Sequence, residues 1–132
     1  MQDGRRSLGE KGEQIAAAAL QEAGLRIIER NWRCRAGELD IIAEEPGPGY
    51  GRGLPDTRWL VLVEVRTRRI HAYGSARQAF THKKQAKLRE LATLYVHEKM
   101  WRGPWRIDAV AVQMDRSGKL ISVEHIRHAV TG

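Results

Sequence analysis

The sequence has very little cysteine and no long apolar segment. Its one cysteine, Cys34, excludes an internal disulfide and a zinc site built from several cysteines. No run of about 18 apolar residues is present, so no membrane-spanning helix and no membrane partner are expected. The N-terminal segment Met1–Glu13 lacks the apolar core of a signal peptide, and we therefore expect a cytoplasmic protein.

Acidic residues are outnumbered by basic ones. Lysine and arginine total 23 against 16 aspartates and glutamates, which gives a formal net charge of +7. Such a charge attracts nucleic-acid phosphates or other anionic surfaces, although many small basic proteins bind no nucleic acid. The 132 residues fit one domain, 1–132, whose polar residues 1–8 are expected to be flexible.

The hydrophobic pattern predicts an α/β fold in which helices flank a mixed β-sheet, with the order α-β-β-β-α-β and a weak last element. A Pro/Gly-rich loop is expected at residues 45–57, and a basic turn at 66–74. The expected elements are a helix at 9–23, strands at 25–34, 39–43 and 59–65, a helix at 75–100 with a break near Thr81, a strand at 106–112 and a strand or short helix at 120–130.

Three carboxylates stand where apolar side chains are expected. Glu64 lies in the run Trp59–Val65, and strand alternation places it on the same face as Leu62 and Arg66. Asp40 lies in the neighbouring strand if the two form a hairpin, and Glu13 falls on the apolar side of the first helix. A buried carboxylate requires a cation, a metal or several hydrogen bonds.

Two interpretations of these carboxylates follow. Together they can form a site for Mg²⁺, which prefers oxygen ligands and keeps several waters. Singly, each can be a structural side chain. Glu64 would then pair with Arg66 or Arg68, Asp40 with Arg33 or Arg35, and Glu13 would be a surface residue of its helix.

Short motifs in a fixed order resemble a known family. Asp40 followed by Glu64-Val65-Arg66 resembles the PD-(D/E)xK nuclease pattern. With the other motifs, the chain resembles the YraN family of predicted endonucleases, related in fold to Holliday-junction resolvases, from about Gly9 to Val112. These motifs are Gly9-Glu10-Lys11-Gly12-Glu13, Arg30-Asn31-Trp32-Arg33, Gly37-Glu38-Leu39-Asp40, Val63-Glu64-Val65-Arg66-Thr67-Arg68, Tyr73-Gly74, Lys84 and Arg106-Ile107-Asp108.

The resemblance implies a restriction-endonuclease-like fold and a site for Mg²⁺ or Mn²⁺. Asp40, Glu64 and the carbonyl of Val65 would be the metal ligands, and Glu13 would complete the site. The PD-(D/E)xK superfamily pattern ends in lysine where this chain has Arg66, and arginine cannot serve as a base. Arginine at this position also resembles what parts of the YraN family carry, so it does not by itself imply inactivity. Arg66 could still bind phosphate, and Lys84, one turn before Leu88 on the second long helix, is a candidate to replace the missing lysine.

Basic residues follow the Glu64 strand and open the next helix. They would bind DNA phosphates without reading base sequence, and Tyr73 could stack on a splayed base. The sequence therefore predicts a metal-dependent DNA endonuclease, with a homodimer suiting a symmetric substrate. Two alternatives are a nucleic-acid-binding module without catalysis and a basic protein that binds another protein through its Trp101–Trp105 end. The predicted nucleic-acid contacts are Arg66, Arg68, Arg69, Tyr73, Arg77, Lys83, Lys84 and Lys87.

Overall fold

The fold was analysed in a computed structural model, which describes residues 4–48, 57–69 and 82–130. Two helices and five strands are present in the order α-β-β-β-α-β-β. The elements are α1 (Gly4–Glu22), β1 (Arg26–Cys34), β2 (Gly37–Gly47), β3 (Thr57–Arg69), α2 (His82–Glu98), β4 (Trp105–Met114) and β5 (Leu120–Val130).

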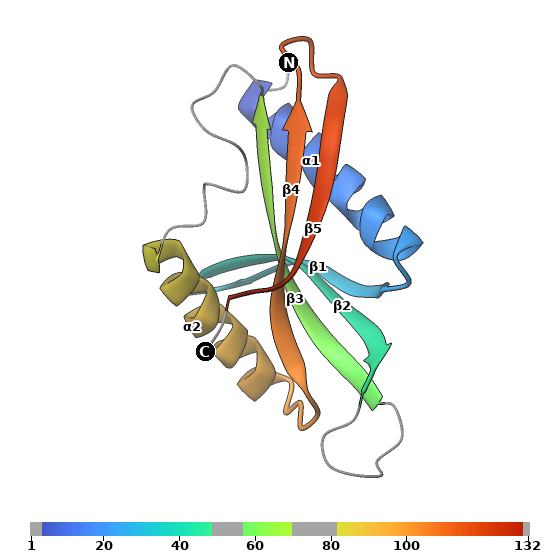
Figure 1. Cartoon of the computed structure of the whole chain (residues 1–132). Helices are drawn as coiled ribbons and strands as arrows, with labels where there is room; N and C mark the ends of the chain where they lie inside the picture. Colours follow the sequence, from blue (N-terminus) through green and yellow to red (C-terminus); the bar gives the residue numbers. More distant parts are fainter. Residues whose placement is uncertain (1–3, 49–56, 70–81, 131–132) are drawn as a thin grey trace.

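The strands form one mixed sheet in the order β1-β2-β3-β4-β5. β3 and β4 are parallel and are linked through α2, whereas every other neighbouring pair is antiparallel. Figure 1 shows α1 on one face of the sheet and α2 on the other. This confirms the predicted fold class, and the weak last element is a strand.

Alternation along β3 divides the apolar core between the two faces. Val61 and Val63 pack with Ala16 and Leu20 of α1, in what we call the α1-side cluster. Leu60 and Leu62 pack on the opposite face with the predicted stripe of α2, in the α2-side cluster. That stripe consists of Leu88, Leu91, Ala92 and Tyr95, all of which are buried.

The first helix starts earlier than the sequence indicated. It begins at Gly4 rather than Gly9, which corrects the predicted start of the helix. The predicted flexibility of residues 1–8 stays a prediction. Gly9 and Gly12 weaken the helical pattern, because each glycine costs about 1 kcal/mol relative to alanine. The extra turn has an apolar anchor, since Leu8 packs against the α1-side cluster.

The predicted loop at 45–57 is also too long, because β2 continues to Gly47. Pro46 pairs with Arg58 of β3, and β1 pairs with β2 only as far as Glu44. Proline is tolerated at this point because no strand on the other side needs its N–H. A Cβ at Gly47 would lie 2.7 Å from Trp59 Cδ1, so glycine makes room for the indole ring.

The predicted turn at 66–74 is strand up to Arg69. Arg66–Arg69 continue the parallel ladder with β4, which ends in the pair Arg69 and Met114. Backbone pairing rather than apolar side chains extends β3, and this pairing is invisible to a hydrophobic pattern. The predicted start of the second helix and its break near Thr81 lie outside the described residues, and α2 is described from His82.

Aromatic side chains fix the hairpin of β1 and β2 to α2. The rings of Trp32 and Tyr95 meet edge to face, with centroids 5.2 Å apart. Trp32 Nε1 donates a hydrogen bond to Glu98 (3.0 Å), and the Tyr95 hydroxyl donates to Glu29 (3.0 Å). Trp101 and Trp105 are partly buried and pack against the same α2-side cluster.

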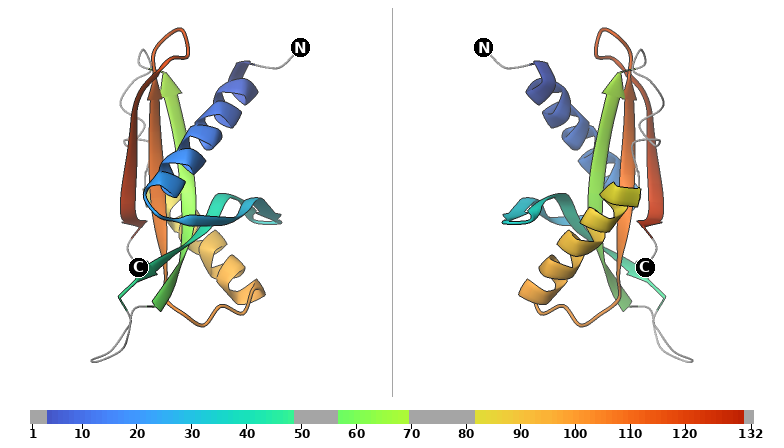
Figure 2. Two further views of the ribbon diagram at one scale, coloured as in Figure 1. Left: turned by 90° about the vertical axis from the view of Figure 1, so that its right-hand side faces the viewer. Right: turned by 90° about the vertical axis from the view of Figure 1, so that its left-hand side faces the viewer.

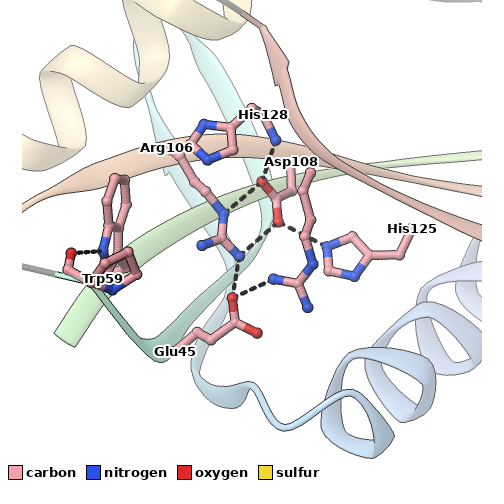
Figure 3. A network of polar contacts seen from close by, with 8 residues as sticks. Glu45, Trp59, Arg106, Asp108, His125 and His128 are labelled. Carbon is pink, nitrogen blue, oxygen red and sulfur yellow. Dashed lines mark hydrogen bonds and ion pairs between the residues drawn. The ribbon is translucent and has the colours of Figure 1, made fainter. Parts of the chain in front are cut away.

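A polar network crosses the other face of the sheet, beside Trp59 (Figure 3). Asp108 of β4 is fully buried and accepts hydrogen bonds from Arg106 Nε (2.9 Å) and from the His128 backbone N–H (3.0 Å). His125 Nε2 lies 2.8 Å from the same carboxylate, and Glu45 pairs with Arg106. Burial opposes ionisation, yet the bonds from His125 and Arg106 outweigh it and lower the pKa of Asp108.

Candidate metal and nuclease site

The candidate site lies where β2 separates from β3. The two strands pair from Gly47 and Thr57 up to Ile41 and Val63. Beyond this point β3 stays with β4, whereas β2 continues with β1 and turns away from the sheet, as Figure 2 shows. The end of this pairing leaves a V-shaped split, which we call the β2/β3 split, with Asp40 on one side and Glu64 on the other.

Asp40 takes the place of the missing backbone partner at the β2/β3 split. The Val65 N–H donates a hydrogen bond to Asp40 Oδ2 at 2.8 Å. In an extended strand, the N–H and C=O of one residue point toward the same edge, so the Val65 carbonyl is also directed toward Asp40. The structure thus brings together the three groups that the sequence predicted as metal ligands: Asp40, Glu64 and the Val65 carbonyl.

Strand alternation is interrupted at Asp40. Leu39 packs in the α2-side cluster, whereas Ile41, two residues later, packs in the α1-side cluster. In a regular strand these two side chains would share a face. The change of face therefore occurs at Asp40.

The two carboxylates oppose each other's ionisation. Burial, then the charge of Asp40, raise the pKa of Glu64 to about 8, although Arg66 acts in the other direction. Burial also raises the pKa of Asp40 to about 6, against the hydrogen bond from Val65 N–H. A hydrogen bond links the two carboxyl groups, so without a cation the pair holds a proton near neutral pH.

Cationic side chains stand beside Glu64 on the α2 face. Arg66 Nη2 lies 3.1 Å from Glu64 Oε1, so the ion pair considered from the sequence is present. Glu64, Arg66 and Lys84 line one cavity of about 210 Å³. The charge of Arg66 and, to a smaller extent, burial lower the pKa of Lys84. The cavity is lined by Gly37, Glu38, Glu64, Arg66, Lys84, Lys87, Leu88 and Leu91.

Glu13 reaches the split from the α1 side. A Cβ at Gly12 would lie 1.9 Å from Thr67 Oγ1, so only glycine lets α1 approach β3 so closely. The next residue, Glu13, lies 3.6 Å from Arg30 Nη2, and its charge helps to raise the pKa of Asp40. Its own pKa is raised, mainly by burial.

The donor set fits a hard divalent cation. Two carboxylates and a backbone carbonyl supply oxygen ligands, and a cation would replace the proton that the pair otherwise shares. Among residues 4–48, 57–69 and 82–130, no three His, Cys, Asp or Glu side chains form a group able to hold a metal. Asp40 and Glu64 would supply the carboxylate ligands, and waters would complete the coordination, as Mg²⁺ prefers.

Four of the predicted nucleic-acid contacts lie near the cavity. Arg66 and Arg68 share the face of Glu64 by alternation, and Lys84 and Lys87 line the cavity from α2. Lys83 is exposed, and alternation places Arg69 on the opposite face. Tyr73 and Arg77 lie outside the described residues.

Two residues near the pair were not singled out from the sequence as members of the site. Glu38 lines the cavity and contributes to the raised pKa of Asp40. Asn31 has a positive φ of 55° within β1, a conformation that asparagine adopts more readily than most residues. The spacing of Glu38 and Asp40 was a usable signal for the first, whereas nothing in the sequence marks the backbone of Asn31.

No helix in the described part of the chain is long and apolar enough to cross a membrane.

A family model described as uncharacterised protein family UPF0102 matches residues 12–112. A UPF0102 protein of Roseiflexus castenholzii is 41% identical over 130 residues, covering 96% of each chain. One of Pelotomaculum thermopropionicum is 40% identical over 130 residues, covering 98% of this chain and 99% of the relative. The chain therefore belongs to the UPF0102 family, in agreement with the YraN-like resemblance of its motifs.

Proposed function

We propose that this protein is a divalent-metal-dependent endonuclease that hydrolyses DNA phosphodiester bonds, with the chemistry of the PD-(D/E)xK superfamily. The observation that carries the proposal is the Asp40–Glu64 pair at the β2/β3 split. Two adjoining carboxylates whose pKa values are both raised are costly unless a cation joins them.

A bound Mg²⁺ or Mn²⁺ would stabilise charge on the scissile phosphate and lower the pKa of an attacking water. Asp40, Glu64 and the Val65 carbonyl are the groups that would hold it. Asp40 is fixed by the Val65 N–H, so the ligand oxygens are oriented before a cation arrives. This preorganisation reduces the free-energy cost of binding.

Arg66 and Lys84 supply the positive charge on the substrate side. Arg66 is always charged, so its role is to bind a phosphate oxygen and stabilise negative charge in the transition state. The lowered pKa of Lys84 makes proton exchange easier for this residue than for an ordinary lysine. Both line the cavity that contains Glu64, which places phosphate binding and the carboxylates together.

A substrate panel tests the proposal. Single-stranded, duplex, flapped and four-way DNA would each be incubated with Mg²⁺ or Mn²⁺ and resolved on denaturing gels. We expect cleavage of at least one substrate, and a loss of at least about 100-fold in Glu64→Gln. Glu22→Gln, an exposed carboxylate at the end of α1, is the matched control and should cleave as wild type.

One observation favours a second candidate, a nucleic-acid-binding module without catalysis. Arg66 already pairs with Glu64 at 3.1 Å, and arginine cannot replace a lysine base. Thermal unfolding with and without Mn²⁺ separates the two candidates. Stabilisation by Mn²⁺ together with cleavage supports the nuclease. Salt-sensitive DNA binding with neither cleavage nor Mn²⁺ stabilisation supports the module.

A further inference from the structure

Asn31 has an unusual backbone conformation directly opposite Asp40. Its neighbours Arg30 and Trp32 pair with Ile41 and Leu39 of β2, so Asn31 is level with the aspartate. Its φ of 55° lies in the left-handed region, which interrupts an extended strand. The bend in β1 and the change of face in β2 thus occur at the same level of the hairpin.

The side chain of Asn31 connects two carboxylates that belong to different elements. With its amide nitrogen toward these acceptors, it donates to Glu38 Oε1 of β2 at 2.9 Å and to Glu13 Oε1 of α1 at 3.1 Å. The orientation of the amide follows from these neighbours, because its oxygen would otherwise face only acceptors. One amide group therefore ties α1 to the hairpin beside Asp40.

The two carboxylates that Asn31 holds are close to the candidate metal ligands. Glu38 lines the cavity with Glu64, and Glu13 follows Gly12, which lies against Thr67 of the Glu64 strand. Each also has a cation of its own. Arg30 lies 3.6 Å from Glu13 Oε1, and Arg33 lies 3.1 Å from Glu38 Oε2. These cations reduce the repulsion that the cluster would otherwise suffer.

We propose that Asn31 is a positioning residue of the metal site. Its amide holds Glu13 and Glu38 beside the Asp40–Glu64 pair, where their oxygens accept hydrogen bonds from the waters of a bound divalent cation. The inference rests on the proposed function, and it explains how a site with only two carboxylate ligands orients the waters that a magnesium-type ion retains.

A purely structural role for Asn31 makes a different prediction. In that case the residue would only accommodate the bend in β1, and glycine, which adopts positive φ at no steric cost, would replace it without loss. The positioning role requires the amide itself. Asn31→Gly therefore separates backbone conformation from side-chain bonding, and Met100→Gly is a matched control, because Met100 has a φ of 53° in an exposed position after α2.

The experiment is a titration of each metal-free protein with Mn²⁺ by calorimetry, with urea unfolding in EDTA as the measure of stability. We expect Asn31→Gly to bind Mn²⁺ about 10-fold more weakly than wild type, as is usual when a partner of a ligand shell is removed. Met100→Gly should bind as wild type. Glu38→Gln, which leaves β1 intact, should also weaken binding, and it carries the test if Asn31→Gly does not fold.

The double variant tests whether the two residues act together. If Asn31 acts by holding Glu38, the loss in affinity of Asn31→Gly/Glu38→Gln should be smaller than the product of the single losses. If wild type binds Mn²⁺ and either Asn31→Gly or Glu38→Gln binds it equally tightly, the inference is overturned and the proposed function is left intact. No binding of Mn²⁺ by wild type overturns the proposed function, and the inference with it.

Discussion

Two buried carboxylate sites lie on the same sheet and show opposite electrostatics. Asp108 is surrounded by donors, and the bonds from His125 and Arg106 lower its pKa. Glu64 faces another carboxylate, and burial together with Asp40 raises its pKa to about 8. The donors around Asp108 stabilise its negative charge. The pair of carboxylates at Asp40 and Glu64 would gain from a further cation. Of the two sites, the second has the raised carboxylate pKa values that are typical of a functional site.

Removal of the Asp108 carboxylate should have the largest effect on stability. Asp108→Ala leaves the buried Arg106 with Glu45 alone and removes the acceptor of the His128 N–H. Breaking a buried ion pair in this way costs about 3–5 kcal/mol. Urea unfolding at pH 7 measures this loss. Glu22→Ala, an exposed carboxylate, should change stability by less than about 0.5 kcal/mol.

If Asp108→Ala and wild type have the same free energy of unfolding, the network of Figure 3 does not stabilise the fold. The contrast between the two sites would then disappear.

In the metal-free protein, Glu64→Gln should increase the free energy of unfolding, whereas Asp108→Ala should decrease it. Because the pKa of Glu64 is raised in the fold, the folded state binds the proton more tightly than the unfolded state between about pH 4.5 and 8. Wild-type stability therefore falls as pH rises through this window. The glutamine variant lacks the ionised group and should be more stable than wild type by a few kcal/mol at pH 9.

Urea unfolding in EDTA from pH 4 to 9 measures this difference, which should vanish near pH 4. Asp108 supplies the contrast: its lowered pKa means that its contribution is present above pH 3.8 and is lost as pH falls through the lower, folded value. A wild-type curve that rises between pH 6 and 9 relative to Glu64→Gln would contradict the assignment.

Gly12→Ala should have a smaller effect on stability and a selective one on the site. A Cβ would meet the Thr67 side chain and push α1 away from β3, at a cost of about 1–3 kcal/mol. Because Glu13 is the next residue, Mn²⁺ affinity should fall as well. Gly9→Ala is the matched control: no atom lies within 4 Å of its Cβ, and alanine should stabilise the helix by about 0.5–1 kcal/mol.

Calorimetric titration with Mn²⁺ measures affinity in both glycine variants. Equal affinities would show that the placement of α1 matters for folding alone.

The pattern of apolar residues predicted the sheet, the stripe of α2 and the shared face of Glu64 and Arg66. It also predicted the hairpin that brings Asp40 beside the Glu64 strand. It could not predict the β2/β3 split, because regular alternation assumes that a strand keeps its face, and Asp40 is where that assumption fails. The low pKa of Asp108 was equally hidden, since its donors Arg106 and His125 come from two different strands.

The hydrogen bond from the Val65 N–H to Asp40 has a consequence for comparing relatives. The side chain of Asp40 accepts the hydrogen bond that a backbone carbonyl would accept in a regular sheet. A family member without catalytic activity would therefore still be under selection to keep this aspartate. Glutamate at position 64 lies buried beside another carboxylate, and this burial opposes folding unless Arg66 or a bound metal ion offsets the charge. Across the family, the residue at position 64 should therefore distinguish enzymes from binding proteins, and the residue at position 40 should not.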